Sequence, residues 1–125
     1  SLPEEICRQL GQVLALAREL IACDVLERPV QWQRLCGMTD EELRSHSHRP
    51  QDYYGQPHFM PEATDGAAIA QLNRCRCAVR AAELAAAHAF QSPEGTCTRA
   101  DILKALNRMS SMVYILMIQL KAKQR

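Results

Sequence analysis

Apolar residues recur every three or four positions along three stretches of the chain, which is the spacing of an amphipathic helix. The first stretch, residues 3–24, has Pro3 near the first helical position and two glutamates in the first turn, and both features suit a helix N-terminus. Pro29 prevents any continuation of this helix, because its ring clashes with the preceding turn. The pattern therefore predicts one long amphipathic helix at the start of the chain.

The other two long stretches follow one another in the second half of the chain. Residues 66–91 are rich in alanine and have neither glycine nor proline after their start, so we expect the longest helix here. A Ser-Pro-Glu-Gly break follows at residues 92–95. Thr98 then caps a last helix, with Asp101 three residues further on, and this helix runs to the basic end of the chain.

Shorter elements are expected between the first and second long helices. Residues 31–37 have the length of one short helix, with Trp32 packed inward. Thr39 and Glu42 form a capping box, in which each side chain bonds to the backbone of the other residue, and this box predicts a short helix through His48.

The segment from residue 49 to residue 65 combines prolines, glycines and aromatic residues, which indicates a long ordered loop. No stretch of the sequence alternates with the two-residue period of a strand. The fold class expected for residues 1–125 is therefore all-α, a single-domain helical bundle with three main helices, short ones and one long ordered loop.

Composition adds limits on partners. Hydrophobic residues make up 47% of the chain and charged residues 23%, which is typical of a soluble globular protein. The net charge of +1 gives no electrostatic basis for binding nucleic acid or an anionic membrane, and the longest apolar run, residues 112–118, is too short to span a bilayer. The six cysteines lack metal-site pairing, and Cys75 and Cys77 point to opposite sides of their helix. We expect buried, reduced thiols in a cytoplasmic protein.

One polar stripe runs along the alanine-rich helix. Arg76, Arg80 and Glu83 fall at positions i, i+4 and i+7 and share one narrow face, with Asn73 one turn earlier. One interpretation is a solvated surface whose Arg80–Glu83 pair contributes only ~0–1 kcal/mol. The other is a pair of guanidinium groups, held by the carboxylate, that bind a polyphosphate. Periodicity alone favours the solvated surface.

A second polar strip lies on the last helix, which is otherwise apolar all round. Its members are Asn107, Ser110, Ser111 and Tyr114. Because buried polar groups need partners, the strip indicates either hydrogen bonds between helices or one wall of a polar ligand site. In the second case Asn107 and Arg108 would contact a nucleotide. The residues alone leave both interpretations open.

The long loop places one aromatic residue, Phe59, between Pro57 and Pro61, which restrict the backbone. A lone phenylalanine in such a position is normally an anchor in the core. The histidines nearby, including His58, do not have the spacing of metal ligands. We therefore expect no metal site within the chain.

Three ordered segments together resemble the ATP:corrinoid adenosyltransferases of the PduO type. They are the loop with Phe59, the helix with Arg76, Arg80 and Glu83, and the last helix with the Leu-Asn-Arg-Met-Ser sequence that begins at Leu106. The resemblance is closer to the EutT type, found in ethanolamine utilisation, and extends from about residue 38 to the end of the chain. The segments that carry it are residues 38–43, 47–50, 61–63 and 101–111.

This resemblance implies a bundle of the cobalamin adenosyltransferase kind and transfer of the 5′-deoxyadenosyl group of ATP to the cobalt of cob(I)alamin, giving adenosylcobalamin. Arg76 and Arg80 would bind the triphosphate of ATP, which arrives with a divalent cation, and Glu83 would orient Arg80. Asn107 and Arg108 would hold the nucleotide from the neighbouring helix.

On the corrinoid side, the resemblance implies that Phe59 lies beneath the corrin ring and displaces the lower axial ligand of cobalt. Loss of that ligand makes Co(II) easier to reduce to Co(I), the nucleophile that attacks the ribose C5′. The catalytic residues implied are Phe59, Arg80 and Glu83.

The resemblance is incomplete. The glycine-rich segment that opens PduO-type enzymes and the cysteine-rich metal segment of the EutT type have no counterpart in these residues, and Ser111 stands where an acid often follows the last motif. We therefore expect the C-terminal part of a longer adenosyltransferase, which forms a homo-oligomer with sites between subunits and which, within the cytoplasm, associates with a bacterial microcompartment. The alternative is a non-catalytic helical bundle that binds a nucleotide or corrinoid, or docks to a metabolosome partner.

Overall fold

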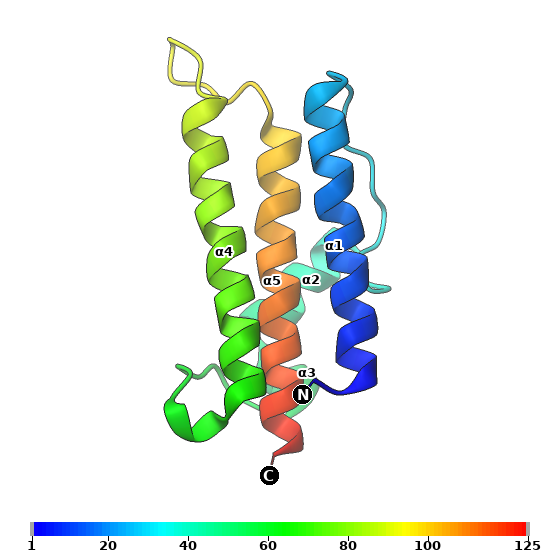
Figure 1. Ribbon diagram of the computed structural model, residues 1–125, viewed down its shortest axis with the longest axis vertical. Helices are drawn as coiled ribbons and strands as arrows, with labels where there is room; N and C mark the ends of the chain where they lie inside the picture. The colour runs from blue at the N-terminus through cyan, green and yellow to red at the C-terminus, as the bar shows by residue number, and fades with distance from the viewer. Residues whose placement is uncertain (1, 125) are drawn as a thin grey trace.

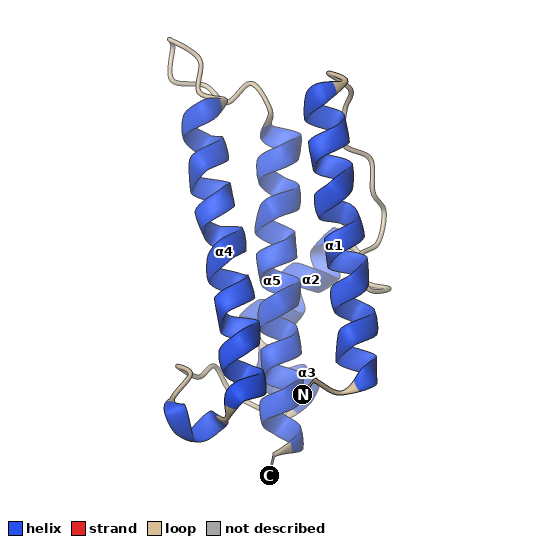
Figure 2. Cartoon of the chain, in the orientation of Figure 1, coloured by secondary structure: helices blue, strands red, loops and turns tan. Residues whose placement is uncertain are grey.

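Three long helices lie side by side in the computed structural model, which describes residues 2–124. The central one, α5, runs antiparallel to α4 on one side and to α1 on the other (Figure 1). Two short helices, α2 and α3, lie behind α5 (Figure 2). Loops and one 3-10 turn, η1, connect the helices. The bounds are α1 Glu4–Val25, α2 Asp40–His48, α3 Pro50–Tyr54, η1 Ala63–Asp65, α4 Ala67–Ala89 and α5 Ala100–Lys123. The expected all-α bundle with three main helices is confirmed.

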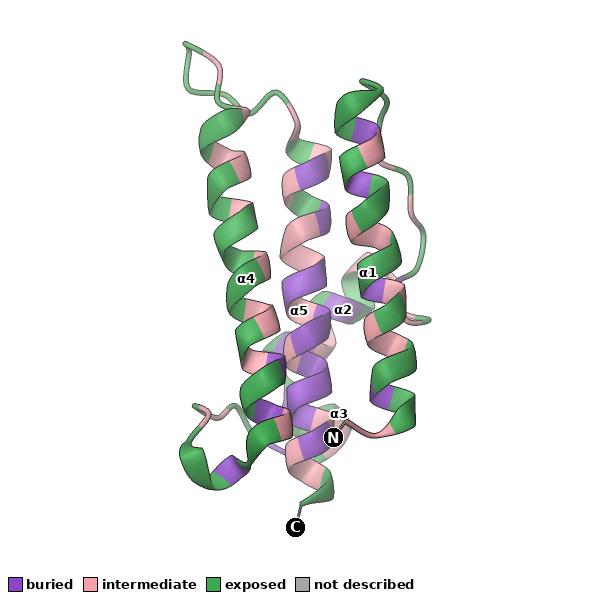
Figure 3. Cartoon of the chain, viewed as in Figure 1, coloured by how far each residue is buried: buried purple, intermediate pink, exposed green. Residues whose placement is uncertain are grey.

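α5 is the core of the bundle because apolar residues cover most of its circumference, and such a helix must be enclosed by others. Buried positions run along most of α5, whereas they form sparse stripes on α1 and α4 (Figure 3). On α4 the buried residues are Ile69 and Leu72, both in the first two turns. The alanine-rich remainder of α4 therefore presents a polar and small-residue surface beside α5.

Local sequence signals set the start of the first two helices. Pro3 is the N-cap of α1, so the predicted helix over residues 3–24 is confirmed to within one residue. The capping box is also confirmed, since Thr39 Oγ1 accepts from the Glu42 amide at 3.2 Å and Glu42 Oε1 accepts from the Thr39 amide at 3.0 Å. These bonds begin α2.

The short helix expected over residues 31–37 is wrong, because a two-residue turn takes its place. Leu35 and Met38 exchange backbone hydrogen bonds of 2.8 and 3.0 Å, and both central residues have positive φ, 53° at Cys36 and 80° at Gly37. Glycine enters this region without steric cost. Trp32 does pack against the core, as expected, and Leu35 is the buried residue of the turn.

Two expectations about the second half of the chain need correction. Thr98 does not cap α5: the N-cap is Arg99, and the Thr98 amide and hydroxyl both donate to the Phe90 carbonyl, at 2.8 and 2.9 Å. These bonds close the connection between α4 and α5. The helix over residues 66–91 is also not the longest, since α4 has 23 residues and α5 has 24.

The long loop is ordered, and it contains α3 and η1. It ends at Gly66, whose φ of 97° and ψ of 170° lie in a region open essentially to glycine alone. The six cysteines are free thiols, but the expectation that they are buried is wrong for Cys7, Cys77 and Cys97, which are exposed. No helix within residues 2–124 has both the length and the hydropathy to cross a bilayer.

Candidate functional site

A polar cleft of about 240 Å³ lies where the middle of α4 and α5 meets the end of α2 and the loop before η1. It brings together two arginines of the α4 stripe and all four members of the α5 strip. The residues that line it are Ser47, His48, His58, Arg76, Arg80, Asn107, Ser110, Ser111 and Tyr114.

Arg76 is held in place from two sides. Its Nε and a terminal nitrogen donate to Asn73 Oδ1 at 3.3 and 3.1 Å, and its guanidinium carbon lies 5.7 Å from the centre of the Tyr114 ring. A cation over an aromatic face is attracted by the ring quadrupole. The guanidinium is therefore positioned at the cleft before any ligand arrives.

Arg80 is freer than Arg76. Its side chain is 58% exposed, and its closest carboxylate oxygen is Glu83 Oε1 at 3.7 Å, which is too long for a hydrogen bond. The expectation that Glu83 orients Arg80 has only this loose contact behind it and stays a prediction. Arg80 can turn toward an anion in the cleft at little energetic cost, because an exposed pair of this kind contributes ~0–1 kcal/mol.

Glu83 makes its closer contact with the neighbouring helix. Asn107 Nδ2 donates to Glu83 Oε2 at 3.2 Å, while within residues 2–124 the buried Glu83 Oε1 has no hydrogen-bond partner. This bond fixes the Asn107 amide at the edge of the cleft and links α4 to α5. It was not visible in the sequence, because the two residues are far apart along the chain.

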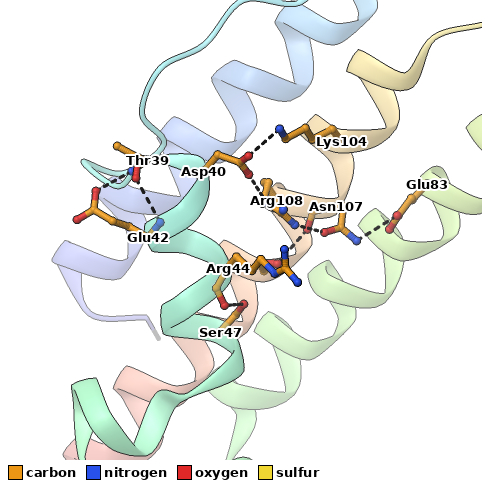
Figure 4. A network of polar contacts seen from close by, with 10 residues as sticks. Thr39, Asp40, Glu42, Arg44, Ser47, Glu83, Lys104, Asn107 and Arg108 are labelled. Carbon is orange, nitrogen blue, oxygen red and sulfur yellow. Dashed lines mark hydrogen bonds and ion pairs between the residues drawn. The ribbon is translucent and has the colours of Figure 1, made fainter.

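Arg108 does not line the cleft and reaches toward Asp40 at the start of α2 (Figure 4). Its Nε donates to Asp40 Oδ1 and another guanidinium nitrogen donates to Asn107 Oδ1 at 2.7 Å. Lys104 Nζ lies 2.7 Å from the other Asp40 oxygen, and Lys104 and then Arg108 lower the pKa of the Asp40 carboxyl. A direct nucleotide contact by Arg108 stays a prediction; in this structure Arg108 reaches the cleft through Asn107.

Phe59 lies beside the cleft but does not line it. The side chain is half-buried against the core, and Lys121 Nζ lies 5.3 Å from the ring centre. Its amide donates to Tyr114 Oη at 3.3 Å, so the loop carrying Phe59 is attached to a cleft residue. Phe59 therefore packs as an anchor in the core and also lies next to the cleft.

Sequence reasoning missed the two histidines of the cleft, His48 and His58, because it weighed them only as metal ligands. His58 donates from Nε2 to the His48 carbonyl at 2.9 Å, and its Nδ1 lies 2.9 Å from Tyr114 Oη. Within the described chain no three His, Cys, Asp or Glu side chains come together as a candidate metal site. Burial raises the pKa of the Cys75 thiol, which disfavours the thiolate that a metal needs.

The chemistry of the cleft is that of an anion site. The described residues that line it include two guanidinium groups, an amide, hydroxyls and imidazoles, and none of them is a carboxylate. Guanidinium groups match the geometry of phosphate oxygens. The cleft's volume of about 240 Å³ falls below the ~300–1,000 Å³ typical of pockets that enclose a whole ligand.

Comparison with known proteins identifies a family for this chain. The family described as Cobalamin adenosyltransferase matches residues 9–120. The chain is 38% identical over 115 residues to the corrinoid adenosyltransferase EutT of Escherichia coli strain K12, covering 92% of this chain and 43% of that protein. It is 39% identical over 104 residues to the EutT protein of Salmonella typhimurium strain LT2, covering 83% of this chain and 39% of that protein.

The chain thus spans less than half the length of the curated relatives it matches. No solved structure matches it. The resemblance to the EutT type is confirmed, and because the family match extends over most of the chain, the protein belongs to the cobalamin adenosyltransferase family.

Proposed function

We propose that the chain is a corrinoid adenosyltransferase that moves the 5′-deoxyadenosyl group of ATP to the cobalt of cob(I)alamin. The observation that carries the proposal is the cleft, where Arg76, Arg80 and Asn107 converge on a space lined by donors in a chain of this family. Membership of the family alone would leave open whether these residues meet in space.

In the proposed reaction, cob(I)alamin donates an electron pair from cobalt to the ribose C5′. The new Co–C bond replaces the C5′–O bond, and the triphosphate leaves with the electrons of that bond. Arg76 and Arg80 would bind the triphosphate and stabilise the charge it gains, which is the kind of electrostatic stabilisation that accelerates group transfer most. The cob(I) state has to come from a one-electron reductant outside the chain, acting on cob(II)alamin.

The nucleotide would be positioned from both helices. Asn107 is held by Glu83 and Arg108, so its amide is already oriented when ATP enters, and such pre-organisation lowers the entropic barrier. The divalent cation would arrive on the ATP phosphates, because the described residues do not supply a cluster of metal ligands. Phe59 would meet the corrin ring at the edge of the cleft.

The site is proposed to be completed by a second copy of the chain in a homo-oligomer, since the cleft is smaller than the pockets that typically enclose a whole ligand. We place the protein in the cytoplasm and in association with a microcompartment of ethanolamine utilisation. The support for this placement is the similarity to the EutT proteins.

ATP binding tests the phosphate assignment. Arg80→Ala and Arg76→Ala should each weaken ATP binding by roughly 10- to 100-fold, because a hydrogen bond to a charged group contributes ~1.5–3 kcal/mol. Arg74→Ala is the matched control, since Arg74 is an exposed arginine of the same helix that does not line the cleft. Isothermal titration calorimetry with Mg-ATP gives the affinities. Equal affinities for the wild type and Arg80→Ala would show that the stripe is a solvated surface.

Transfer itself is tested by adding Mg-ATP and then cob(II)alamin, and by recording the absorbance and paramagnetic resonance spectra before and after a reductant is supplied. The proposal expects a spectral shift that marks loss of the lower axial ligand, followed by the spectrum of adenosylcobalamin. Binding without product would instead support the non-catalytic binding module.

A further inference from the structure

Tyr114 is the point at which three parts of the site meet. Its hydroxyl lies 2.9 Å from His58 Nδ1 and 3.3 Å from the Phe59 amide nitrogen. Its ring is stacked on the His58 ring, with centroids 5.6 Å apart and planes at 15°, and the Arg76 guanidinium lies over the ring. Tyr114 thus contacts both Arg76 of α4 and the loop that carries Phe59.

The hydrogen-bond partners define where the protons are. A carbonyl oxygen can only accept, so His58 carries a proton on Nε2, which donates to the His48 carbonyl at 2.9 Å. In the neutral imidazole Nδ1 is then an acceptor, and the Tyr114 hydroxyl donates to it. The Phe59 amide donates to the Tyr114 oxygen, so each polar group of this small network has a partner.

The two ends of the network differ in rigidity. Tyr114 lies between Val113 and Ile115, both fully buried, in the most enclosed part of α5. Residues 57–61 belong to neither a helix nor a strand, and proline at each end supplies no amide donor. The Tyr114 hydroxyl therefore links both the His58 side chain and the Phe59 amide to α5, while the His48 carbonyl holds the other side of the His58 ring.

We propose that Tyr114 is a positioning residue that joins the nucleotide and corrinoid halves of the site. Its ring supports the Arg76 guanidinium, and its hydroxyl fixes the loop that places Phe59. This inference rests on the proposed adenosyltransferase function. It adds that the ring and the hydroxyl of Tyr114 have separate roles. Removal of the hydroxyl alone should disturb the corrinoid side and spare the nucleotide side.

Tyr114→Phe separates the two roles because it keeps the ring. The matched control is Tyr54→Phe, which also removes a hydroxyl bonded to a histidine, since Tyr54 Oη lies 2.7 Å from His46 Nδ1 and neither residue lines the cleft. Three quantities are measured for each purified chain: amide hydrogen exchange of residues 57–61, affinity for Mg-ATP, and the fraction of cob(II)alamin that loses its lower ligand when Mg-ATP is present.

For Tyr114→Phe we expect exchange at the Phe59 amide to accelerate ~2- to 10-fold, as loss of one hydrogen bond implies. The affinity of this variant for Mg-ATP should stay within about twofold of the wild type. The fraction of cob(II)alamin that loses its lower ligand should fall several-fold. Tyr54→Phe should keep the wild-type values of all three quantities. An unchanged cob(II)alamin fraction in Tyr114→Phe would overturn the inference and leave the proposed function intact. A loss of ATP affinity as large as the loss of the cobalt signal would also overturn it.

Failure of the wild-type chain to give any ATP-dependent cob(II)alamin signal would overturn the proposed function, and the positioning role with it. If Tyr114→Phe does not fold, nitrogen-15 spectra of histidine in the wild type still decide the point. The network requires a His58 ring protonated at Nε2 and accepting at Nδ1, and the opposite tautomer would refute it.

Discussion

Replacement of Asp101 by asparagine is expected to weaken the fold at neutral pH, and to weaken it less as the pH falls. Asp101 lies in the first turn of α5 and accepts from the Val30 amide at 2.9 Å. It also accepts from Arg99 at 3.1 and 3.2 Å, and Arg99 donates to the Arg28 carbonyl at 2.9 Å. The carboxylate therefore joins the segment after α1 to the start of the central helix.

The size of the effect follows from the pKa of Asp101. Hydrogen bonds from Arg99 above all, and from the Val30 amide, outweigh burial and lower that pKa from 3.8 to about 2. A difference of this size corresponds to ~2.4 kcal/mol at most, at ~1.36 kcal/mol per pKa unit. Because the side chain is 32% exposed, screening by solvent reduces the expected contribution to ~1–2 kcal/mol.

The sign is that of a carboxyl group whose pKa is lower in the folded state. Its contribution is complete above the unfolded pKa, near pH 4, and is lost as the pH falls toward the folded pKa near 2. Asparagine keeps an oxygen that can accept from Val30 but loses the charge that Arg99 needs. The wild type should therefore exceed Asp101→Asn in free energy of unfolding by ~1–2 kcal/mol at pH 7, and by much less near pH 2.5.

Urea unfolding followed by circular dichroism at several pH values between 7 and 2.5 gives these differences. Glu94→Gln is the control, because Glu94 is an exposed carboxylate in the turn after α4. A difference between wild type and Asp101→Asn that is constant across this range, or that grows as the pH falls, would refute the linkage.

Three further changes test other parts of the structure. Thr39→Ala removes the capping box with Glu42 and should cost ~1 kcal/mol in thermal or urea unfolding; no loss would mean that α2 is held by packing alone. Leu116→Ala empties a fully buried position of α5 and should cost ~2–5 kcal/mol, whereas Leu84→Ala, at an exposed position, should stay within ~0.5 kcal/mol. Phe59→Ala should abolish the ATP-dependent loss of the lower ligand of cob(II)alamin while ATP affinity persists, and an unaltered cobalt spectrum would remove the corrinoid role of Phe59.

The candidate site was predictable where its members lie on one helix. Arg76 and Arg80 share a face because of helical geometry alone, and Asn107, Ser110 and Tyr114 form a strip for the same reason. The structure shows that these two faces meet at one cleft. The sequence could not show this, because the rotation of one helix against another depends on how all their side chains pack.

Local interactions explain what the sequence determined by itself. The all-α fold, the three long helices and the Thr39–Glu42 box depend on contacts within one or two helical turns, and these signals were sufficient. Thr98 carries a similar signal but bonds to the Phe90 carbonyl, eight residues back, a contact of the α4–α5 connection that a capping pattern does not include.

Tertiary structure alone decided which charges are free to bind a ligand. Arg108 looks in sequence like one more nucleotide contact, yet Asp40, 68 residues away, occupies its guanidinium. Arg80, with one loose contact to Glu83, remains available at the cleft. The physical reason is that the carboxylate partners of an arginine come from helices that the sequence does not place side by side, so the donors left over for a ligand are known only once the helices have packed.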